Sequence, residues 1–343
     1  MLPELLRGSS VSRRALSKSI ETGSIVDAGR SFCFRIPPGL RRWQLRNFVA
    51  LGRMLAIQAR SKKELVFIGK AAALLHELPV FGSLPHIDFS SGLSTHLVLP
   101  GGRAVSEGGD SIVFGSALAR GHRRRPKATT KLEGSLCASS LQETCAQAAM
   151  NASGAQALAI LDAALRTYIP QSVLRTRNVD GYAAIARQSI FEILNRNAST
   201  RGIRGARELL AIASPLCESP AESLAHYSAY LSGLEYVLQH KVWAVQKHFY
   251  LDLYFPKYGV AIEIDGFGKY VDLSKRTTQQ TIDAEHSRQN LIQSGGIKVI
   301  RTNWNDLQDS NANARYFLQL CKQSGRPLRH TYTRATRALE HSW

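Results

Sequence analysis

Three acidic residues interrupt two neighbouring apolar segments of the sequence. Asp252 lies within HFYLDLYF, and Glu263 and Asp265 alternate with apolar residues in AIEID. In a β-strand, residues two positions apart point to the same face, so Glu263 and Asp265 are predicted to face the same side. Acidic residues have low strand propensity and are costly to bury unless they are paired or bind a metal.

These three carboxylates suggest a divalent metal site. They would repel one another on adjacent strands, and a hard cation such as Mg²⁺, or Mn²⁺ in its place, relieves that repulsion. Such an ion polarises a phosphodiester and activates water for in-line attack. The alternative for Glu263 and Asp265 is a solvent-facing strand edge.

Further elements are predicted around the three acids. Ser219, Pro220 and Glu222 have the spacing of a helix start with a capping box. Capping alone is the alternative role for Glu222. We expect strands over 236–245, 249–255 and 260–265, then a polar helix over 278–294 and a last strand over 297–302. The predicted order is therefore αβββαβ.

This order and these residues resemble the PD-(D/E)XK nuclease superfamily. The branch it is most similar to is a group of uncharacterised bacterial proteins, of actinobacterial type, related to the very-short-patch-repair endonuclease. The matching stretches are ESPAES at 218–223, LDLYFP at 251–256, AIEIDGFGKY at 261–270, Arg288, and GIKVIRTNW at 296–304.

The resemblance implies a restriction-endonuclease-like fold and roles for single residues. Asp252, Glu263 and Asp265 would be metal ligands, and Glu222 would complete the site by orienting a water or the ion. The superfamily's lysine is replaced by Asp265, and Lys269 would supply the missing cation. Arg288 and Arg301 would contact phosphate; a solvated helix face is the alternative for Arg288, and an ion pair with a site acid for Arg301.

Positive charge is concentrated at the start of the chain. The sequence of 343 residues has a formal net charge of +18, and residues 1–70 hold 14 Lys and Arg against 4 Asp and Glu. Such a patch attracts nucleic acid by releasing counterions. Arg13, Arg14 and Lys18 are the candidate contacts there. Arg123, Arg124 and Arg125 form a second basic run, for which a solvated loop is the alternative.

The whole chain is predicted to be an α/β (α+β) protein of four parts. Residues 1–40 are expected to form a basic winged-helix-like module, with a weak resemblance to the domain of abortive-infection-type antitoxins. A mixed helical and β spacer follows over 41–214, then the endonuclease-like domain over 215–310, and a C-terminal helix and basic tail over 311–343. The oligomeric state is left open.

The composition indicates a cytoplasmic protein without a membrane segment. No run approaches the roughly 20 apolar residues of a membrane-spanning helix, and the start lacks a signal peptide's apolar run. Five scattered cysteines form no CxxC pair, which argues against structural zinc and a disulfide framework.

The sequence therefore predicts a Mg²⁺- or Mn²⁺-dependent DNA endonuclease or nickase. Two alternatives stay open. One is a DNA-binding regulator, antitoxin-like, whose nuclease fold is catalytically inactive. The other is an RNA-directed nuclease of a toxin system, with the same site and a different substrate.

Overall fold

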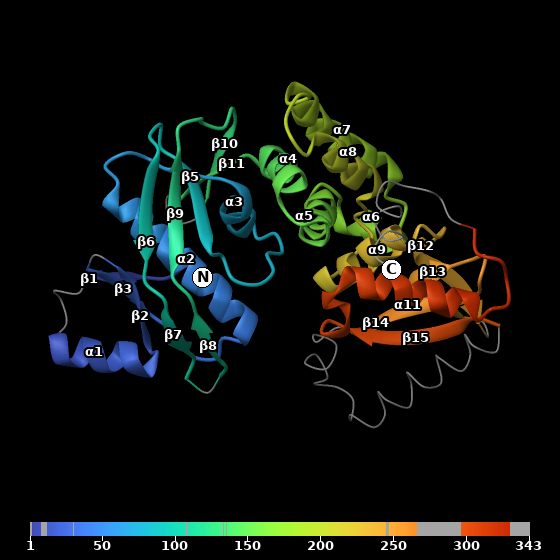
Figure 1. The fold of residues 1–343 in the computed structure, drawn as a ribbon, viewed down its shortest axis with the longest axis horizontal. Helices are drawn as coiled ribbons and strands as arrows, with labels where there is room; N and C mark the ends of the chain where they lie inside the picture. Colours follow the sequence, from blue (N-terminus) through green and yellow to red (C-terminus); the bar gives the residue numbers. More distant parts are fainter. Residues whose placement is uncertain are drawn as a thin grey trace. The chain divides into compact units, whose positions relative to one another are not determined.

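A computed structural model describes residues 2–7, 12–29, 31–107, 109–132, 134, 136–244, 247–265 and 296–329 of the chain. It is a mixed α/β structure that divides into two compact units (Figure 1). Unit 1 comprises Met1–Ala152 and Ser189–Ala206, and unit 2 comprises Ser153–Gln188 and Arg207–Trp343. The predicted borders after residues 40, 214 and 310 are not borders between these units, and the four-part division stays a prediction.

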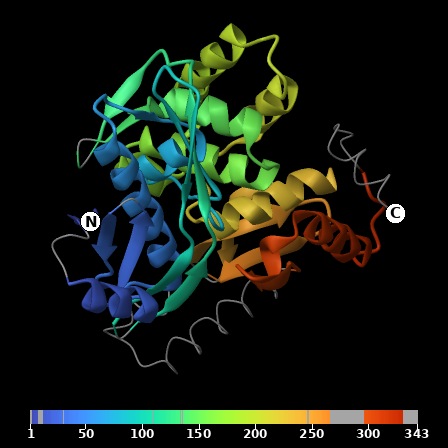
Figure 2. The ribbon, with the colours of Figure 1, turned by 60° about the vertical axis from the view of Figure 1, so that its left-hand side comes forward.

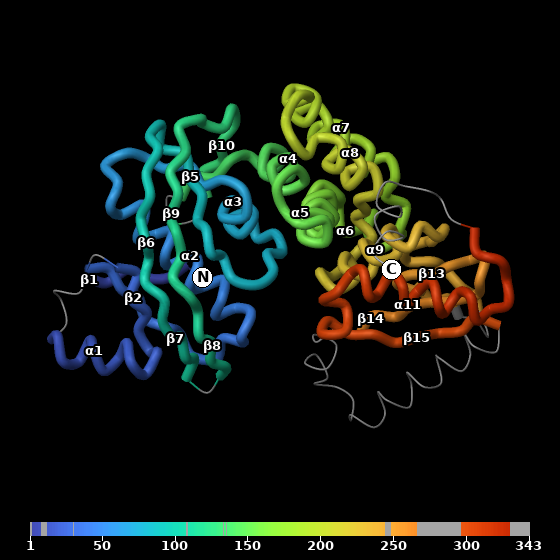
Figure 3. Tube along the Cα trace, viewed as in Figure 1, coloured from blue at the N-terminus to red at the C-terminus, as the bar shows by residue number. Residues whose placement is uncertain are grey.

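Unit 1 contains three β-sheets. The strands are β1 (Leu5–Arg7), β2 (Ile25–Gly29), β3 (Phe32–Arg35), β4 (Val66–Phe67), β5 (His86–Ser90), β6 (Thr95–Leu99), β7 (Gly102–Val105), β8 (Ser111–Phe114), β9 (Ala117–His122), β10 (Thr129–Lys131) and β11 (Cys137–Ser139). They are ordered β1-β3-β2, β7-β8 and β10-β11-β4-β5-β9-β6, so that β9 runs between β5 and β6 (Figure 3).

Helix α2 (Arg42–Arg60) connects the two largest cores of unit 1. Leu45, Phe48 and Val49 pack with Phe34 beneath the N-terminal sheet. Residues Met54 and Ile57 pack instead against the six-stranded sheet. A helix that is buried on two faces fixes both sheets to one rigid element. The other helices of unit 1 are α1 (Arg13–Thr22), α3 (Gly69–Leu75) and α4 (Leu141–Asn151) (Figure 2).

The described part of the N-terminal module consists of α1 and a three-stranded sheet, and its likeness to a winged helix stays a prediction. Ser12 caps α1 and Gly23 ends it in the left-handed conformation. Within the described residues, α1 precedes the hairpin of β2 and β3. Residues 5–7 form β1, because their backbone pairs with β3 in antiparallel register.

Unit 2 contains one four-stranded sheet in the order β12-β13-β14-β15. The strands are β12 (Val237–Ala244), β13 (Lys247–Phe255), β14 (Val260–Asp265) and β15 (Lys298–Asn303), close to the predicted ranges. The first three pair antiparallel, and β15 pairs parallel to β14. The helix predicted over 278–294 lies outside the described residues.

Helices pack around this sheet and on one another. They are α5 (Gly154–Thr167), α6 (Gln171–Thr176), α7 (Asp180–Arg196), α8 (Ile203–Ile212), α9 (Pro220–Ser232), the short 3₁₀ helix η3 (Asp306–Gln308) and α11 (Ser310–Lys322). Helix α7 crosses the border between the units, and the first residues of α8 belong to unit 1. Helix α9 packs against both α5 and α11. Phe317 of α11 meets Phe255 of β13 with ring centroids 5.8 Å apart.

The close approach of α2 to the N-terminal sheet depends on Gly52. A Cβ atom at this position would fall on the ring of the fully buried Phe34. We therefore expect Gly52→Ala to lower the free energy of unfolding by about 1–3 kcal/mol, since a packed core cannot absorb the extra methyl group without strain. Urea unfolding measures this. Gly205→Ala is the matched control: nothing lies within 4 Å of the added Cβ, and a stability change of zero to about 1 kcal/mol upward is expected. An equal effect of the two substitutions would contradict this prediction.

Candidate functional site

Glu222, at the start of α9, and Asp252, on β13, are brought together where α9 meets the unit 2 sheet. Ser219 caps α9, and its hydroxyl accepts a hydrogen bond from the Glu222 backbone N–H at 3.2 Å. The Glu222 carboxylate in turn accepts hydrogen bonds from the Glu218 N–H at 2.9 Å and from the Ser219 hydroxyl at 2.8 Å. The capping role of Glu222 is therefore confirmed.

Capping is not the only contact of Glu222, because the side chain of Gln239 joins it to Asp252. The Gln239 Nε2 group donates to Glu222 Oε2 at 3.3 Å and to Asp252 Oδ1 at 3.0 Å. The second oxygen of Asp252 accepts the Ile264 N–H at 2.9 Å. The two carboxylates thus come from different elements and share one buried amide donor.

Gln239 is a site residue that sequence reasoning missed. It lies in β12 opposite Asp252, between the register pairs formed by Leu238 and His240. Its backbone φ of 50° is unusual for a residue other than glycine. The sequence offers no clear signal for this residue, because His240 and Lys241 follow it in the same strand and its burial is decided by packing.

Proximity to Asp252 changes the acidity of Glu222. Burial, and then the negative charge of Asp252, raise the pKa of Glu222 from 4.5 to about 7. Two carboxylates that share a poorly solvated site resist ionising together. At neutral pH this pair is therefore able to take up positive charge, as a proton or as a cation.

Glu263 and Asp265 follow on β14. The register of β13 and β14 pairs Leu253 with Ile262, so the next position along it aligns Asp252 with Glu263. Glu263 is only 7% exposed and lies beside Arg301 of β15. Asp265 forms an ion pair with Arg301, with NH1 and Oδ1 3.5 Å apart. The ion-pair alternative for Arg301 is therefore the one that the structure contains.

The described residues do not form the predicted three-carboxylate metal site. Their only group of three or more potential ligands with donor atoms within 4.8 Å of one another is Asp162, Cys217 and His226. Asp252, Glu263 and Asp265 are not such a group, and neither are Glu222, Asp252 and Glu263.

The remaining predicted residues lie in several places. Lys269 and Arg288 are outside the described residues. Arg13, Arg14 and Lys18 are exposed on α1, and Arg123, Arg124 and Arg125 are exposed after β9; all six belong to unit 1.

The cluster of Asp162, Cys217 and His226 was not predicted, because its members are far apart in the sequence. Asp162 Oδ1 accepts the Ser214 N–H at 2.7 Å, and Oδ2 lies 3.2 Å from His226 Nδ1. The Cys217 sulfur lies 3.6 Å from the same nitrogen. Sulfur, nitrogen and oxygen donors suit Zn²⁺ better than Mg²⁺ or Mn²⁺. These contacts link Asp162 of α5 to His226 of α9 and to the residues that precede this helix.

All five cysteines are buried and free. Among the described helices, none combines the length and apolar character that crossing a membrane requires.

Comparisons with protein-family models, with curated proteins and with solved structures find no match to this chain.

The raised pKa of Glu222 predicts a pH dependence of stability. Between pH 4.5 and about 7 the folded protein keeps a proton that the unfolded chain has released. The free energy of unfolding contributed by Glu222 therefore falls as pH rises through this window. Glu222→Gln should lose less stability than the wild type between pH 5 and pH 8, measured by urea unfolding in EDTA. Glu235→Gln, at an exposed ion pair with Lys257, is the control and should retain the wild-type dependence. The prediction is wrong if Glu222→Gln and wild type lose equal stability.

The buried cluster predicts a second stability effect. Asp162→Ala leaves the Ser214 N–H and the His226 ring without their buried acceptor, so we expect a loss of about 3 kcal/mol in urea unfolding. Asp162→Asn retains an oxygen for the Ser214 N–H and should lose less. An unchanged unfolding midpoint in Asp162→Ala would show that the cluster does not hold α9 in place.

Proposed function

We propose that unit 2 is a divalent-metal-dependent phosphodiester hydrolase acting on nucleic acid, with DNA as the first candidate substrate. The observation that carries the proposal is the bridge from Glu222 through Gln239 to Asp252. It holds two carboxylates together at the point where Glu263 follows on the adjacent strand. Holding two carboxylates close together costs electrostatic energy, and such an arrangement is typical of sites that bind a cation.

Each residue has a role that its contacts support. Asp252 and Glu263 would hold the ion, and Asp252 is oriented for this by the Gln239 amide and the Ile264 N–H. Glu222 would orient a water through the carboxylate that Ser219 and Glu218 already position. A bound divalent ion supplies charge neutralisation at the phosphate and lowers the pKa of water. Arg301 holds Asp265 and balances the negative charge of β14.

The order of α9, β12, β13, β14 and β15 is compatible with a restriction-endonuclease-like core. The mixed sheet, with three antiparallel strands and then one parallel strand, is the topology expected of αβββαβ. This supports the superfamily assignment as part of the same proposal.

A non-cleaving nucleic-acid-binding protein is the second candidate. The observation that favours it is Asp265, which takes the place of the superfamily's lysine and is engaged by Arg301. In that case Asp252→Asn would leave nucleic-acid binding unchanged, and there would be no activity to lose.

Nicking of supercoiled plasmid with MgCl₂ or MnCl₂ tests the first proposal, with EDTA as the metal-free reference. Asp252→Asn and Glu263→Gln should each slow nicking by about 100-fold or more, because several kcal/mol of charge stabilisation is lost. Glu235→Gln, on the surface of the same unit, should nick at the wild-type rate. Wild-type protein that leaves duplex DNA, single-stranded DNA and RNA intact with both metals would rule out the hydrolase, as would variants that cut at the wild-type rate.

A further inference from the structure

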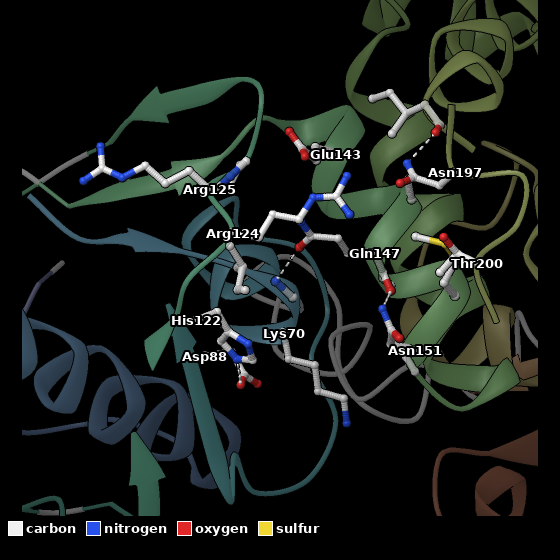
Figure 4. A pocket seen from close by; sticks show the side chains of 18 of the residues that line it. Lys70, Asp88, His122, Arg124, Arg125, Glu143, Gln147, Asn151, Asn197 and Thr200 are labelled. Carbon is white, nitrogen blue, oxygen red and sulfur yellow. Dashed lines mark hydrogen bonds and ion pairs between the residues drawn. The ribbon is translucent and has the colours of Figure 1, made fainter. Parts of the chain in front are cut away.

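Unit 1 contains a cavity that has no part in the site described above. Its volume is about 710 Å³, within the range of small-molecule sites. It is lined by the ends of β5 and β9 and the residues after β9 on one side, and by α4, the end of α7 and the turn after it on the other (Figure 4). All of these residues belong to unit 1.

The acidic groups of the cavity are already engaged. Arg120 donates two hydrogen bonds to Asp88, at 2.8 and 2.9 Å, and His122 Nε2 lies 2.8 Å from the same carboxylate. Burial acts to raise the pKa of Asp88, but these two partners outweigh it and the pKa is lowered. Glu143 accepts the backbone N–H groups of Lys127 and Ala128 at 3.1 and 3.2 Å.

A surplus of positive charge therefore lines the cavity. Its further cationic residues are Lys70, Arg124, Arg125, Lys127 and Arg196. None of the five forms an ion pair within the part of the chain that the structure describes. Unpaired cations around a concave surface attract phosphate more strongly than the same charges on a flat surface, because low-dielectric walls focus their field.

The walls of the cavity are held in place. The fully buried Ser90 hydroxyl donates to the Arg124 carbonyl at 2.8 Å, and Gln147 Oε1 accepts the Gly69 N–H at 2.8 Å. A preorganised site binds a ligand with a smaller loss of entropy.

The wall formed by α4 and the end of α7 carries both polar and apolar side chains. Glu143, Gln147 and Asn151 recur every four residues along one face of α4, and Asn197 follows α7 across from them (Figure 4). Met150, Ile193 and Leu84 supply apolar surface beside these amides. Amides beside apolar side chains are suited to a flat heterocycle that has hydrogen-bonding edges.

We propose that this cavity binds a nucleoside phosphate, with the phosphate at the arginines that follow β9 and the base toward α4. The ligand is either a free nucleotide or the phosphorylated terminal nucleotide of a nucleic-acid strand. The two sources share the same chemistry. This binding needs neither the carboxylates of unit 2 nor a metal ion, so it is independent of the hydrolase proposed above.

Isothermal titration calorimetry in EDTA tests the proposal on the full-length chain. The three ligands are ATP, a 5′-phosphorylated oligothymidylate and the same strand with a 5′-hydroxyl. We expect ATP, the phosphorylated strand or both to bind, and the hydroxyl strand to bind more weakly than the phosphorylated one. Binding of ATP identifies a free nucleotide as sufficient, whereas binding of the phosphorylated strand alone identifies a strand end.

Charge-reversed variants locate the site. Arg124→Glu combined with Arg125→Glu, and separately Lys70→Glu, should weaken binding by about tenfold or more, which corresponds to the loss of one charge-assisted contact. Arg46→Glu, at an exposed arginine of α2 outside the cavity, should bind within about twofold of wild type, since only screened long-range charge is changed. The proposal is overturned if wild type binds none of the ligands, if the cavity variants bind like wild type, or if the 5′-hydroxyl strand binds as tightly as the phosphorylated one.

Discussion

The proximity of Glu222 to Asp252 is the constraint on which the rest of unit 2 depends. Burial raises the pKa of Glu222, and the negative charge of Asp252 raises it further, because two carboxylates in a poorly solvated place repel each other. The Gln239 amide offsets part of this cost by donating to both. The register of β12 with β13 brings Gln239 opposite Asp252, and the buried contacts of Asp162 and His226 hold the helix that carries Glu222.

Holding Glu222 and Asp252 close together lowers the stability of the folded protein. Natural proteins retain like charges in buried sites mainly where function requires them. The contacts of Glu222 divide between capping α9 and facing Asp252, so one side chain both begins the helix and belongs to the site. Capping the helix and facing the neighbouring carboxylate, which the sequence presents as alternatives, therefore do not exclude each other.

Charge is divided between the two compact units. The clustered acids lie in unit 2, whereas the basic residues of α1 and of the cavity lie in unit 1. Under the two proposals above, attraction of phosphate would depend on unit 1 and chemistry on phosphate would depend on unit 2. A substitution in one can change affinity without altering the residues of the other, which makes the two properties separately measurable.

Local patterns in the sequence determined the secondary structure well. Ser219 caps α9 as its spacing to Glu222 predicts, and the strands predicted over 249–255 and 260–265 lie at Lys247–Phe255 and Val260–Asp265. Capping residues and alternating apolar positions act over a few residues, so they can be recognised in the sequence alone. Asp252 and Glu263 were singled out because acids are unusual in apolar strands, and Glu222 was singled out by its capping position.

Only the tertiary structure decided which of these groups meet. Residues 5–7 became a strand because β3 offered them a backbone partner. Asp265 forms an ion pair with Arg301, which the parallel pairing of β15 places beside β14. Gln239, the Asp162 cluster and the basic cavity join residues that are far apart in the sequence, such as Ile68 and Thr200 in the cavity. Contacts of this kind depend on strand order and helix packing, which no local pattern encodes.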